Sequence, residues 1–229
     1  MISRRSLLNA AAGAGVLVVA QGTVLPAAAA NAADDPTGPA EWTRKSSSNG
    51  WRIDPVAVAV HHIEGTTRSV SLHQGDAAVI LLHIARRWHY EIAGIDTGEG
   101  GGITAHTTRR TVSAAFESNY LSGTAIALHP RAYPLAGSER LWPHHEAIVR
   151  DILVDCEGTV AWGGDLKPAK ASHFHIAVRP GDRALARVAE KLDTSRHREF
   201  RAQTAGTVAD PAAPGRRVKA RRLRPVTTG

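Results

Sequence analysis

Apolar residues recur at helical spacing in three stretches of the chain, each of which opens with a residue that favours a helix N-terminus. We expect helices to begin at Asp76, as an N-cap, at Pro143, and after Asp182, as a second N-cap. The recurring apolar positions are Ile80, Ile84 and Trp88 in the first stretch, Ile148, Val149, Ile152 and Leu153 in the second, and Leu185, Val188, Ala189 and Leu192 in the third. The pattern therefore predicts amphipathic helices that bury one face.

Short segments that are apolar, or that alternate apolar and polar residues, predict strands around these helices. The expected strands are Ala57–Val60, Ser69–Leu72, Thr111–Phe116, Thr124–Leu128, Thr159–Trp162 and Ser172–Val178. The glycine cluster Gly98 to Gly102 is expected to form a loop. Strands and helices in this mixed order are typical of an α+β fold, with a small antiparallel or mixed sheet and flanking helices.

Residues 1–32 have the parts of a secretory signal segment. Arg4 and Arg5 precede a mildly apolar stretch, Ala10–Ala20, and a small-residue run with A-x-A triplets follows it. Adjacent arginines are typical of twin-arginine export, and the apolar stretch is far shorter than the roughly 18 residues that a membrane-spanning helix needs. We therefore expect a protein secreted to the cell envelope, without a stable membrane anchor and with its folded domain in residues 40–195.

The net charge of +7 is concentrated at the C-terminal end of the chain. Residues 196–229 carry a run of arginines after an alanine-, proline- and glycine-rich stretch, with almost nothing apolar to bury. Such a composition predicts a basic, disordered tail. Outside the cytoplasm its expected partners are anionic wall polymers, and no nucleic acid is expected. Cys156 is the only cysteine, so no intramolecular disulfide can form and a packed core must stabilise the fold.

Two histidines on one predicted strand are the first candidates for chemistry. His173 and His175 are two residues apart, and side chains at that spacing face the same side of a strand. Both imidazoles are therefore candidates for ligands of one metal ion.

Two sequence blocks resemble a known family. Glu117–Pro130 reads E-S-N-Y-L-S-G-T-A-I-A-L-H-P, similar to the S-x-H-x-x-G-x-A-x-D signature of the zinc D-alanyl-D-alanine peptidases. Trp162–Ile176 reads W-G-G-D-L-K-P-A-K-A-S-H-F-H-I, similar to the later W-G-G-D…[DE]-x-x-H-F block. That family includes vancomycin-resistance-type dipeptidases and carboxypeptidases and phage L-alanyl-D-glutamate endopeptidases. The resemblance spans residues 49–192 and implies the hedgehog/D,D-peptidase type of α+β fold.

In that family, a histidine and an aspartate seven residues apart bind zinc together with a histidine of the later block. An acidic residue three positions before this second histidine is the general base. Three protein ligands leave one coordination position for water, the metal lowers the pKa of that water, and the carboxylate takes its proton.

The scaffold positions of the two blocks match the family, whereas most chemical positions do not. The matching scaffold residues are Ser118, Gly123 and Ala125. Tyr120 stands at the first histidine position, Ala127 at the aspartate position and Lys170 at the base position, so that only His173 matches. An alanine cannot ligate a metal, and a lysine is a cation near pH 7. The resemblance therefore implies a degenerate zinc site, with no cofactor expected.

The favoured interpretation is a pseudoenzyme that acts at the cell wall by binding peptidoglycan stem peptides without cutting them. Ser118 and one of Arg86 or Arg87 are its candidate ligands for a peptide carboxylate.

The alternative interpretation is an active zinc D,D-carboxypeptidase or endopeptidase with relocated ligands. His129 shares the strand face of the aspartate position if that strand continues, so His129, His173 and His175 would form a three-histidine zinc site. Glu117 and Asp165 are then the candidate bases. A secreted structural or inhibitory protein is a further alternative.

Overall fold

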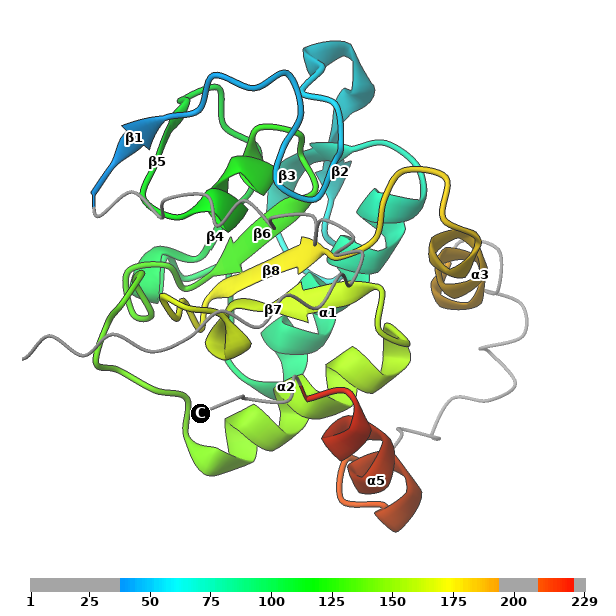
Figure 1. The fold of residues 1–229 in the computed structure, drawn as a ribbon. Helices are drawn as coiled ribbons and strands as arrows, with labels where there is room; N and C mark the ends of the chain where they lie inside the picture. Colours follow the sequence, from blue (N-terminus) through cyan, green and yellow to red (C-terminus); the bar gives the residue numbers. More distant parts are fainter. Residues whose placement is uncertain (1–37, 194–209, 225–229) are drawn as a thin grey trace, which may run out of the picture. The chain divides into compact units, whose positions relative to one another are not determined.

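A computed structural model describes residues 38–193 and 210–224 of the chain (Figure 1). The predicted signal segment, residues 1–32, lies outside the described residues. Small antiparallel sheets with flanking helices make up the described part, which confirms the predicted α+β class. No helix in these residues is long and apolar enough to cross a membrane.

The central sheet has four strands in the order β4-β6-β8-β7, and every neighbouring pair is antiparallel. Its strands are β4 (Ile103–Thr104), β6 (Ala125–Leu128), β8 (His173–Ile176) and β7 (Val160–Trp162). Three of them confirm predicted strands with shortened ends, while β4 lies in a segment where no strand was expected.

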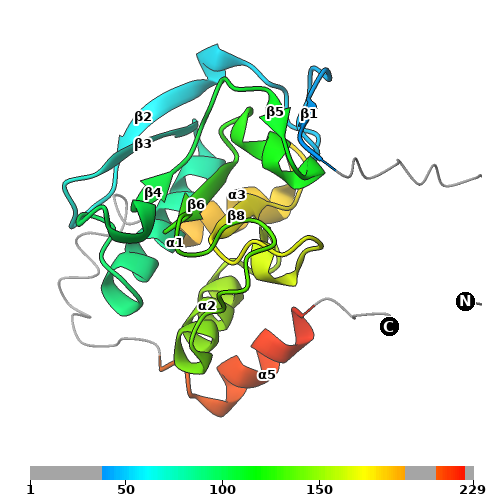
Figure 2. The same ribbon diagram turned by 90° about the vertical axis from the view of Figure 1, so that its left-hand side faces the viewer.

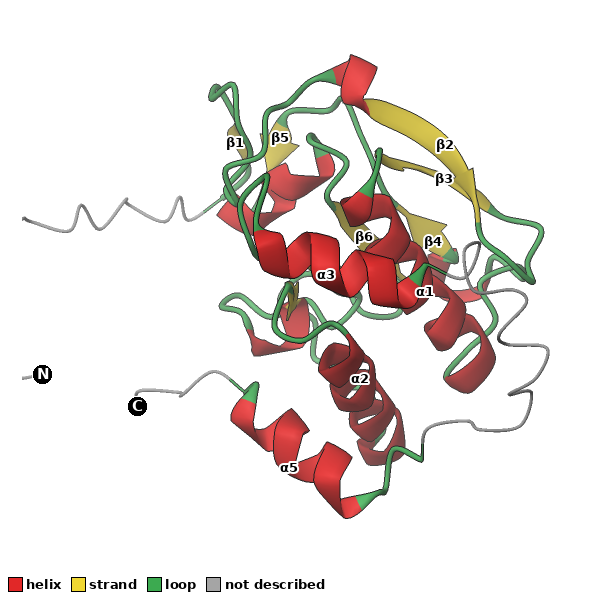
Figure 3. Ribbon diagram, turned by 90° about the vertical axis from the view of Figure 1, so that its right-hand side faces the viewer, coloured by secondary structure: helices red, strands yellow, loops and turns green. Residues whose placement is uncertain are grey.

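The predicted helices are present as α1 (Asp76–Glu91), α2 (Pro143–Asp155) and α3 (Arg183–Leu192). The side chain of Asp182 accepts a hydrogen bond from the amide of Ala184, so the predicted N-cap of α3 is confirmed. The predicted N-cap of α1 is wrong by one residue, because Gly75 takes that position with a φ of 83° and Asp76 is the first helical residue. Figure 3 shows α3 beside α1, and these two helices pack against each other.

Smaller elements complete the described residues. A hairpin of β2 (Val58–His62) and β3 (Ser69–His73) lies beside the central sheet (Figure 2). The predicted strand Thr111–Phe116 is wrong at its C-terminal end, because a 3₁₀ helix starts at Ala115. The remaining elements are β1 (Ala40–Glu41) with its partner β5 (Thr111–Val112), and the 3₁₀ helices η1 (Pro55–Ala57), η2 (Glu99–Gly101), η3 (Ala115–Tyr120) and η4 (Gly163–Asp165).

The core lies between the central sheet and the helices. Ile126 and Leu128 of β6 and Phe174 and Ile176 of β8 are fully buried and belong to one apolar cluster with α1, α2 and α3. Trp88 of α1 packs edge-on against Phe174, with ring centroids 6.0 Å apart. Full burial of such side chains contributes about 1.5–3 kcal/mol each, so this face of the sheet stabilises the fold through hydrophobic burial.

Residues 210–224, the described part of the predicted disordered tail 196–229, differ from that prediction. There a helix, α5 (Pro214–Arg222), runs along α2 (Figure 2). No residue of α5 is buried, and it is held by charge instead. Arg216 forms ion pairs with Asp151 and Asp155 of α2. Composition alone missed this helix because these two acidic partners lie some sixty residues earlier in the sequence.

We predict that Gly123→Ala destabilises the protein far more than Gly181→Ala. Both glycines have a φ in the left-handed region, 70° and 79°, which costs an alanine about 1–2 kcal/mol. A Cβ at Gly123 would also lie 2.7 Å from the backbone nitrogen of His73, whereas nothing lies within 4 Å of one at Gly181. Urea denaturation should show an additional loss of about 2 kcal/mol for Gly123→Ala, and equal losses would contradict the close approach of the hairpin to Gly123.

Candidate functional site

The face of the central sheet that points away from the helices carries the candidate site. Because side chains alternate along a strand, Ala125 and Ala127 of β6 and His173 and His175 of β8 share this face. Ala127 pairs directly with His173, and Ala125 pairs with His175. Because each alanine side chain is small, it leaves room for the imidazole of the histidine that it pairs with. The prediction that His173 and His175 face the same side of the strand is confirmed.

Tyr120 closes this face from the end of η3. Its hydroxyl lies 2.7 Å from Nδ1 of His173, and Nε2 of His173 lies 2.9 Å from Nδ1 of His175. Tyr120 and His175 are 8% and 9% exposed, and His173 is fully buried. The ring of Phe116 packs against His173 with centroids 4.7 Å apart. The result is a buried hydrogen-bonded chain of a phenol and two imidazoles.

The hydroxyl hydrogen of Tyr120 favours one direction for these hydrogen bonds. The Tyr120 hydroxyl has no other hydrogen-bond partner among the described residues, so its hydrogen is satisfied only if Tyr120 donates to Nδ1 of His173. His173 then carries its own proton on Nε2 and donates it to Nδ1 of His175. Both ring nitrogens of His173 are thereby used, and no lone pair on this histidine is free for a metal ion.

Burial keeps the hydrogen-bonded side chains of Tyr120, His173 and His175 uncharged near pH 7. It lowers the pKa of His173 well below its ordinary value, and the neighbouring His175 and Lys170 add to this effect. Burial also lowers the pKa of His175 to about 4. The pKa of Tyr120 is raised well above its ordinary value, first by burial and then by the charge of Glu117. A neutral chain avoids the desolvation cost of a buried charge.

An ion pair lies at the rim of this chain. The ammonium group of Lys170 lies 2.6 Å from Oε1 of Glu117, and their side chains are 13% and 16% exposed. The other carboxylate oxygen of Glu117 accepts from the amide of Ser113 at 2.9 Å. Lys170 also lies 5.2 Å from the ring centroid of Tyr120. The site therefore combines a neutral interior with a charged, partly exposed rim.

Gly163 of the W-G-G block lets the two halves of the site approach each other. A Cβ at this position would overlap the carbonyl oxygen of Lys170 and lie 2.8 Å from Cβ of His173. Two successive backbone hydrogen bonds join these segments, because the amide of Lys170 donates to the carbonyl of Gly163 and the amide of His173 donates to the carbonyl of Lys170, both at 2.9 Å. Gly163 thus allows the close approach of the backbone segments, which is the role expected of a scaffold residue in the W-G-G block.

The two blocks converge in space, as a shared zinc site in the resembled family implies. Tyr120 bonds to His173, Ala127 pairs with His173 across the sheet, and Lys170 reaches over the ring of Tyr120. Four positions that the resemblance assigns to one reaction centre therefore meet, although about fifty residues separate the two blocks in the sequence.

The predicted three-histidine zinc site is wrong. The strand β6 ends at Leu128, and His129 has a φ of 52°, which breaks the alternation that would have placed it beside His173. Its Nδ1 instead accepts from the indole nitrogen of Trp88 at 3.0 Å, on the helix side of the sheet. Among the described residues, no three histidine, cysteine, aspartate or glutamate side chains are arranged to hold a metal ion.

The predicted carboxylate ligands also have other roles. Ser118 is fully buried, and its hydroxyl donates to Ala115 and accepts from the amide of Ser48. Arg86 and Arg87 belong to α1, which covers the opposite face of the sheet. The structure therefore corrects their assignment from peptide binding to internal support.

The arginines and the remaining candidate base are engaged in ion pairs. Arg86 pairs with Glu64 at 3.0 Å, and Arg87 pairs with both Asp151 and Asp155 at 2.9 Å. Asp165, a candidate base of the zinc alternative, pairs with Arg150 of α2. Of the two candidate bases only Glu117 lies at the site, and sequence reasoning missed its pairing with Lys170. The opposite charges of Glu117 and Lys170 in the two blocks were the signal from which this ion pair could have been predicted.

No protein-family model matches the chain, and no curated protein or solved structure is significantly similar to it. The family resemblance of the two blocks thus remains a prediction, and functional argument rests on the site itself.

We predict that His175 makes the protein lose stability as the pH falls from 7 to 5. The folded-state pKa of about 4 lies below the ordinary 6.5, so the unfolded chain takes up protons first in this window. Stability from neutral His175 is complete above about pH 6.5 and is lost on the way down to pH 4, which amounts to about 2 kcal/mol between pH 7 and 5.

Urea denaturation at both pH values measures the total loss, of which His175→Gln should remove about 2 kcal/mol, while the contribution of other buried histidines such as His173 stays. His62→Gln, at an exposed position, is the matched control and should behave as the unmodified protein. An unchanged pH dependence in His175→Gln would contradict the buried neutral state of this histidine.

Proposed function

We propose that the protein is a secreted, non-catalytic relative of the zinc D-alanyl-D-alanine peptidases that binds wall stem peptides at Lys170. The observation that carries the proposal is the convergence of the four motif positions on a hydrogen-bonded chain and an ion pair. Export rests on the twin-arginine pattern of residues 1–32 and places the protein at the cell envelope. The basic C-terminal region adds attraction to anionic wall polymers.

The chemistry of the site argues against hydrolysis. A catalytic zinc site needs three protein ligands, and here the motif positions offer one imidazole, His173, whose two nitrogens are both hydrogen-bonded. Ala127 offers no ligand atom. Lys170 stands where a carboxylate base would take a proton from bound water, and its positive charge opposes a metal cation at the same place.

The rim of the site supports binding. Lys170 carries a positive charge beside the buried residues, 5.2 Å from the ring centroid of Tyr120, and its side chain and that of Glu117 are only 13% and 16% exposed, so a ligand carboxylate must replace the Glu117 carboxylate on Lys170 rather than leave the ammonium group unpaired. Stem peptides end in a carboxylate. In the proposed complex this group takes the place of Glu117 on Lys170.

We predict that Lys170→Met weakens the binding of a synthetic peptide ending in D-alanyl-D-alanine at least about tenfold, because one charge-assisted hydrogen bond is lost. Glu117→Gln should bind the peptide as well as the unmodified protein or better, because the competing carboxylate is gone. Isothermal titration calorimetry measures both changes.

Lys167→Met is the matched control, since Lys167 is exposed and lies on the same loop. It should leave the affinity unchanged. A peptide with an amidated C-terminus should bind weakly in every variant. Equal affinity for the amide, or release of D-alanine by the unmodified protein that a chelator abolishes, would overturn the proposal.

We predict that Tyr120→His, Ala127→Asp and Lys170→Glu together create a zinc site that the unmodified protein lacks. The three positions surround His173, so the new imidazole and carboxylate would complete a three-ligand set. Metal analysis after dialysis should show about one zinc per chain in the triple variant. Each single variant should bind far less, because the ligands act as a unit. Zinc bound equally well by Ala127→Asp alone would contradict this arrangement.

A further inference from the structure

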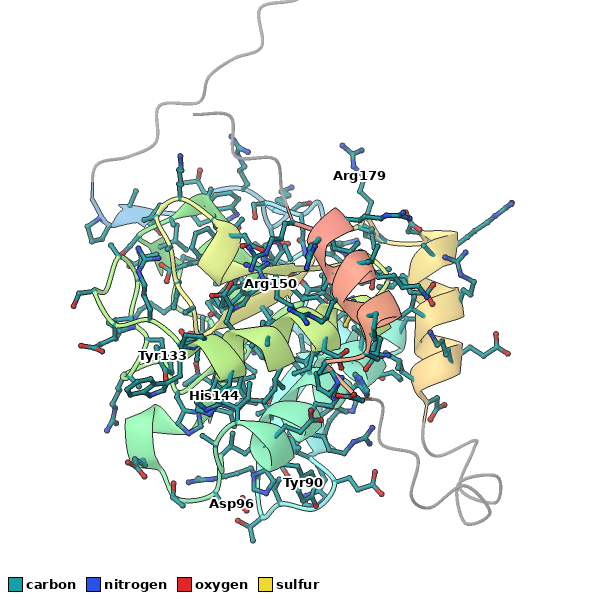
Figure 4. All side chains as sticks on the ribbon, turned by 90° about the horizontal axis from the view of Figure 1, so that it is seen from below. Tyr90, Asp96, Tyr133, His144, Arg150 and Arg179 are labelled. Carbon is teal, nitrogen blue, oxygen red and sulfur yellow. The ribbon has the colours of Figure 1, made fainter. Side chains whose placement is uncertain are left out.

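A cavity of about 600 Å³ lies between α2 and α5, apart from the site described above. Its size is within the range of small-molecule binding sites. Part of its wall is apolar and comes from both helices and the segment before α5: Ala147, Ile148, Pro211, Ala212 and Ala220. Figure 4 shows this region from below, with Arg150 of α2 labelled beside α5.

The rest of the lining is mainly cationic. It contains five arginines against Asp151 and Asp210. Asp151 is only 2% exposed and is neutralised by Arg87 and Arg216. Asp210 accepts a hydrogen bond from the amide of Ala212 at 2.8 Å. The cavity therefore has an excess of positive charge beside an apolar wall.

The five lining arginines differ in whether a carboxylate binds them. Arg150, Arg216 and Arg224 are each held by a carboxylate. The guanidinium groups of Arg217 and Arg221 have no hydrogen-bond or ion-pair partner within residues 38–193 and 210–224. They are four residues apart on α5, so their guanidinium groups lie on the same side of the helix. Two adjacent free guanidinium groups fit a phosphate or carboxylate head group.

We propose that the cavity between α2 and α5 is a binding site for an anionic amphiphile, with the acidic head group on Arg217 and Arg221 and the apolar chain against the alanine and proline wall. The arginines and the apolar wall each favour a different property of the ligand. Arginines alone would serve any polyanion, and an apolar wall alone would favour uncharged ligands. Together they select a molecule that carries both features. The proposal is independent of peptide binding at Lys170.

Calorimetric titration of the full chain with decyl phosphate at low salt tests the proposal. Inorganic phosphate and decyltrimethylammonium are the ligand controls, since the first lacks the apolar chain and the second has the opposite charge. Decyl phosphate should bind at least about tenfold more tightly than either, because only it uses both the arginines and the apolar wall. Absence of binding, or equal binding of inorganic phosphate, would overturn the proposal.

Matched variants separate the site from general charge attraction. The double variant Arg217→Gln/Arg221→Gln should weaken decyl phosphate binding about tenfold or more, through loss of charge-assisted hydrogen bonds. The control Lys219→Gln/Arg222→Gln removes the same charge from residues of α5 that do not line the cavity, and should have little effect. Ala147→Trp, which fills the cavity from an exposed position of α2, should abolish binding while thermal unfolding stays unchanged. Equal loss in the two double variants, or tight binding in Ala147→Trp, would contradict the site.

Discussion

The two-residue period of β6 and β8 is the constraint on which the rest of the site depends. It sends Ile126 and Phe174 into the apolar core under the helices and leaves Ala127 and His173 on the opposite face. A slip of the pairing by one residue would bury two histidines against α1 and expose the core residues instead. The large apolar contribution of the core therefore fixes the register, and the register in turn fixes where the imidazoles lie.

Burial then decides the chemistry of that face. A fully buried imidazole is costly to charge, and neutral His173 meets this constraint by donating a hydrogen bond to His175 and accepting one from Tyr120. Charge is displaced to the rim, where Glu117 and Lys170 remain partly exposed. A metal ion would have to break this satisfied chain before it gained a first ligand. The substituted residues are thus mutually compatible and form a consistent alternative to a metal centre.

Much of this arrangement could be predicted from the sequence, because it depends on local periodicity and on paired motifs. The spacing of His173 and His175 gave their common face, and the two blocks gave the convergence of Tyr120 and Lys170 with them. The position of His129 could not be predicted in this way, since a single residue with a φ of 52° ends the strand and reverses its side chain. Residue spacing contains no signal for such a change.

The position of α5 also could not be predicted from local sequence, because the residues that bind it, Asp151 and Asp155 of α2, are distant in the sequence. Burial alone would raise the pKa of Asp155, but hydrogen bonds from His83 and Arg216 hold that pKa well below its ordinary value. Asp155 is therefore ionised, and it shares Arg216 with the buried Asp151. Ion pairs of this kind gain little net stability but specify geometry, since an unpaired buried charge is strongly disfavoured. Arg216 is thereby held between Asp151 and Asp155 of α2, on the side of α5 from which Arg217 and Arg221 also line the cavity.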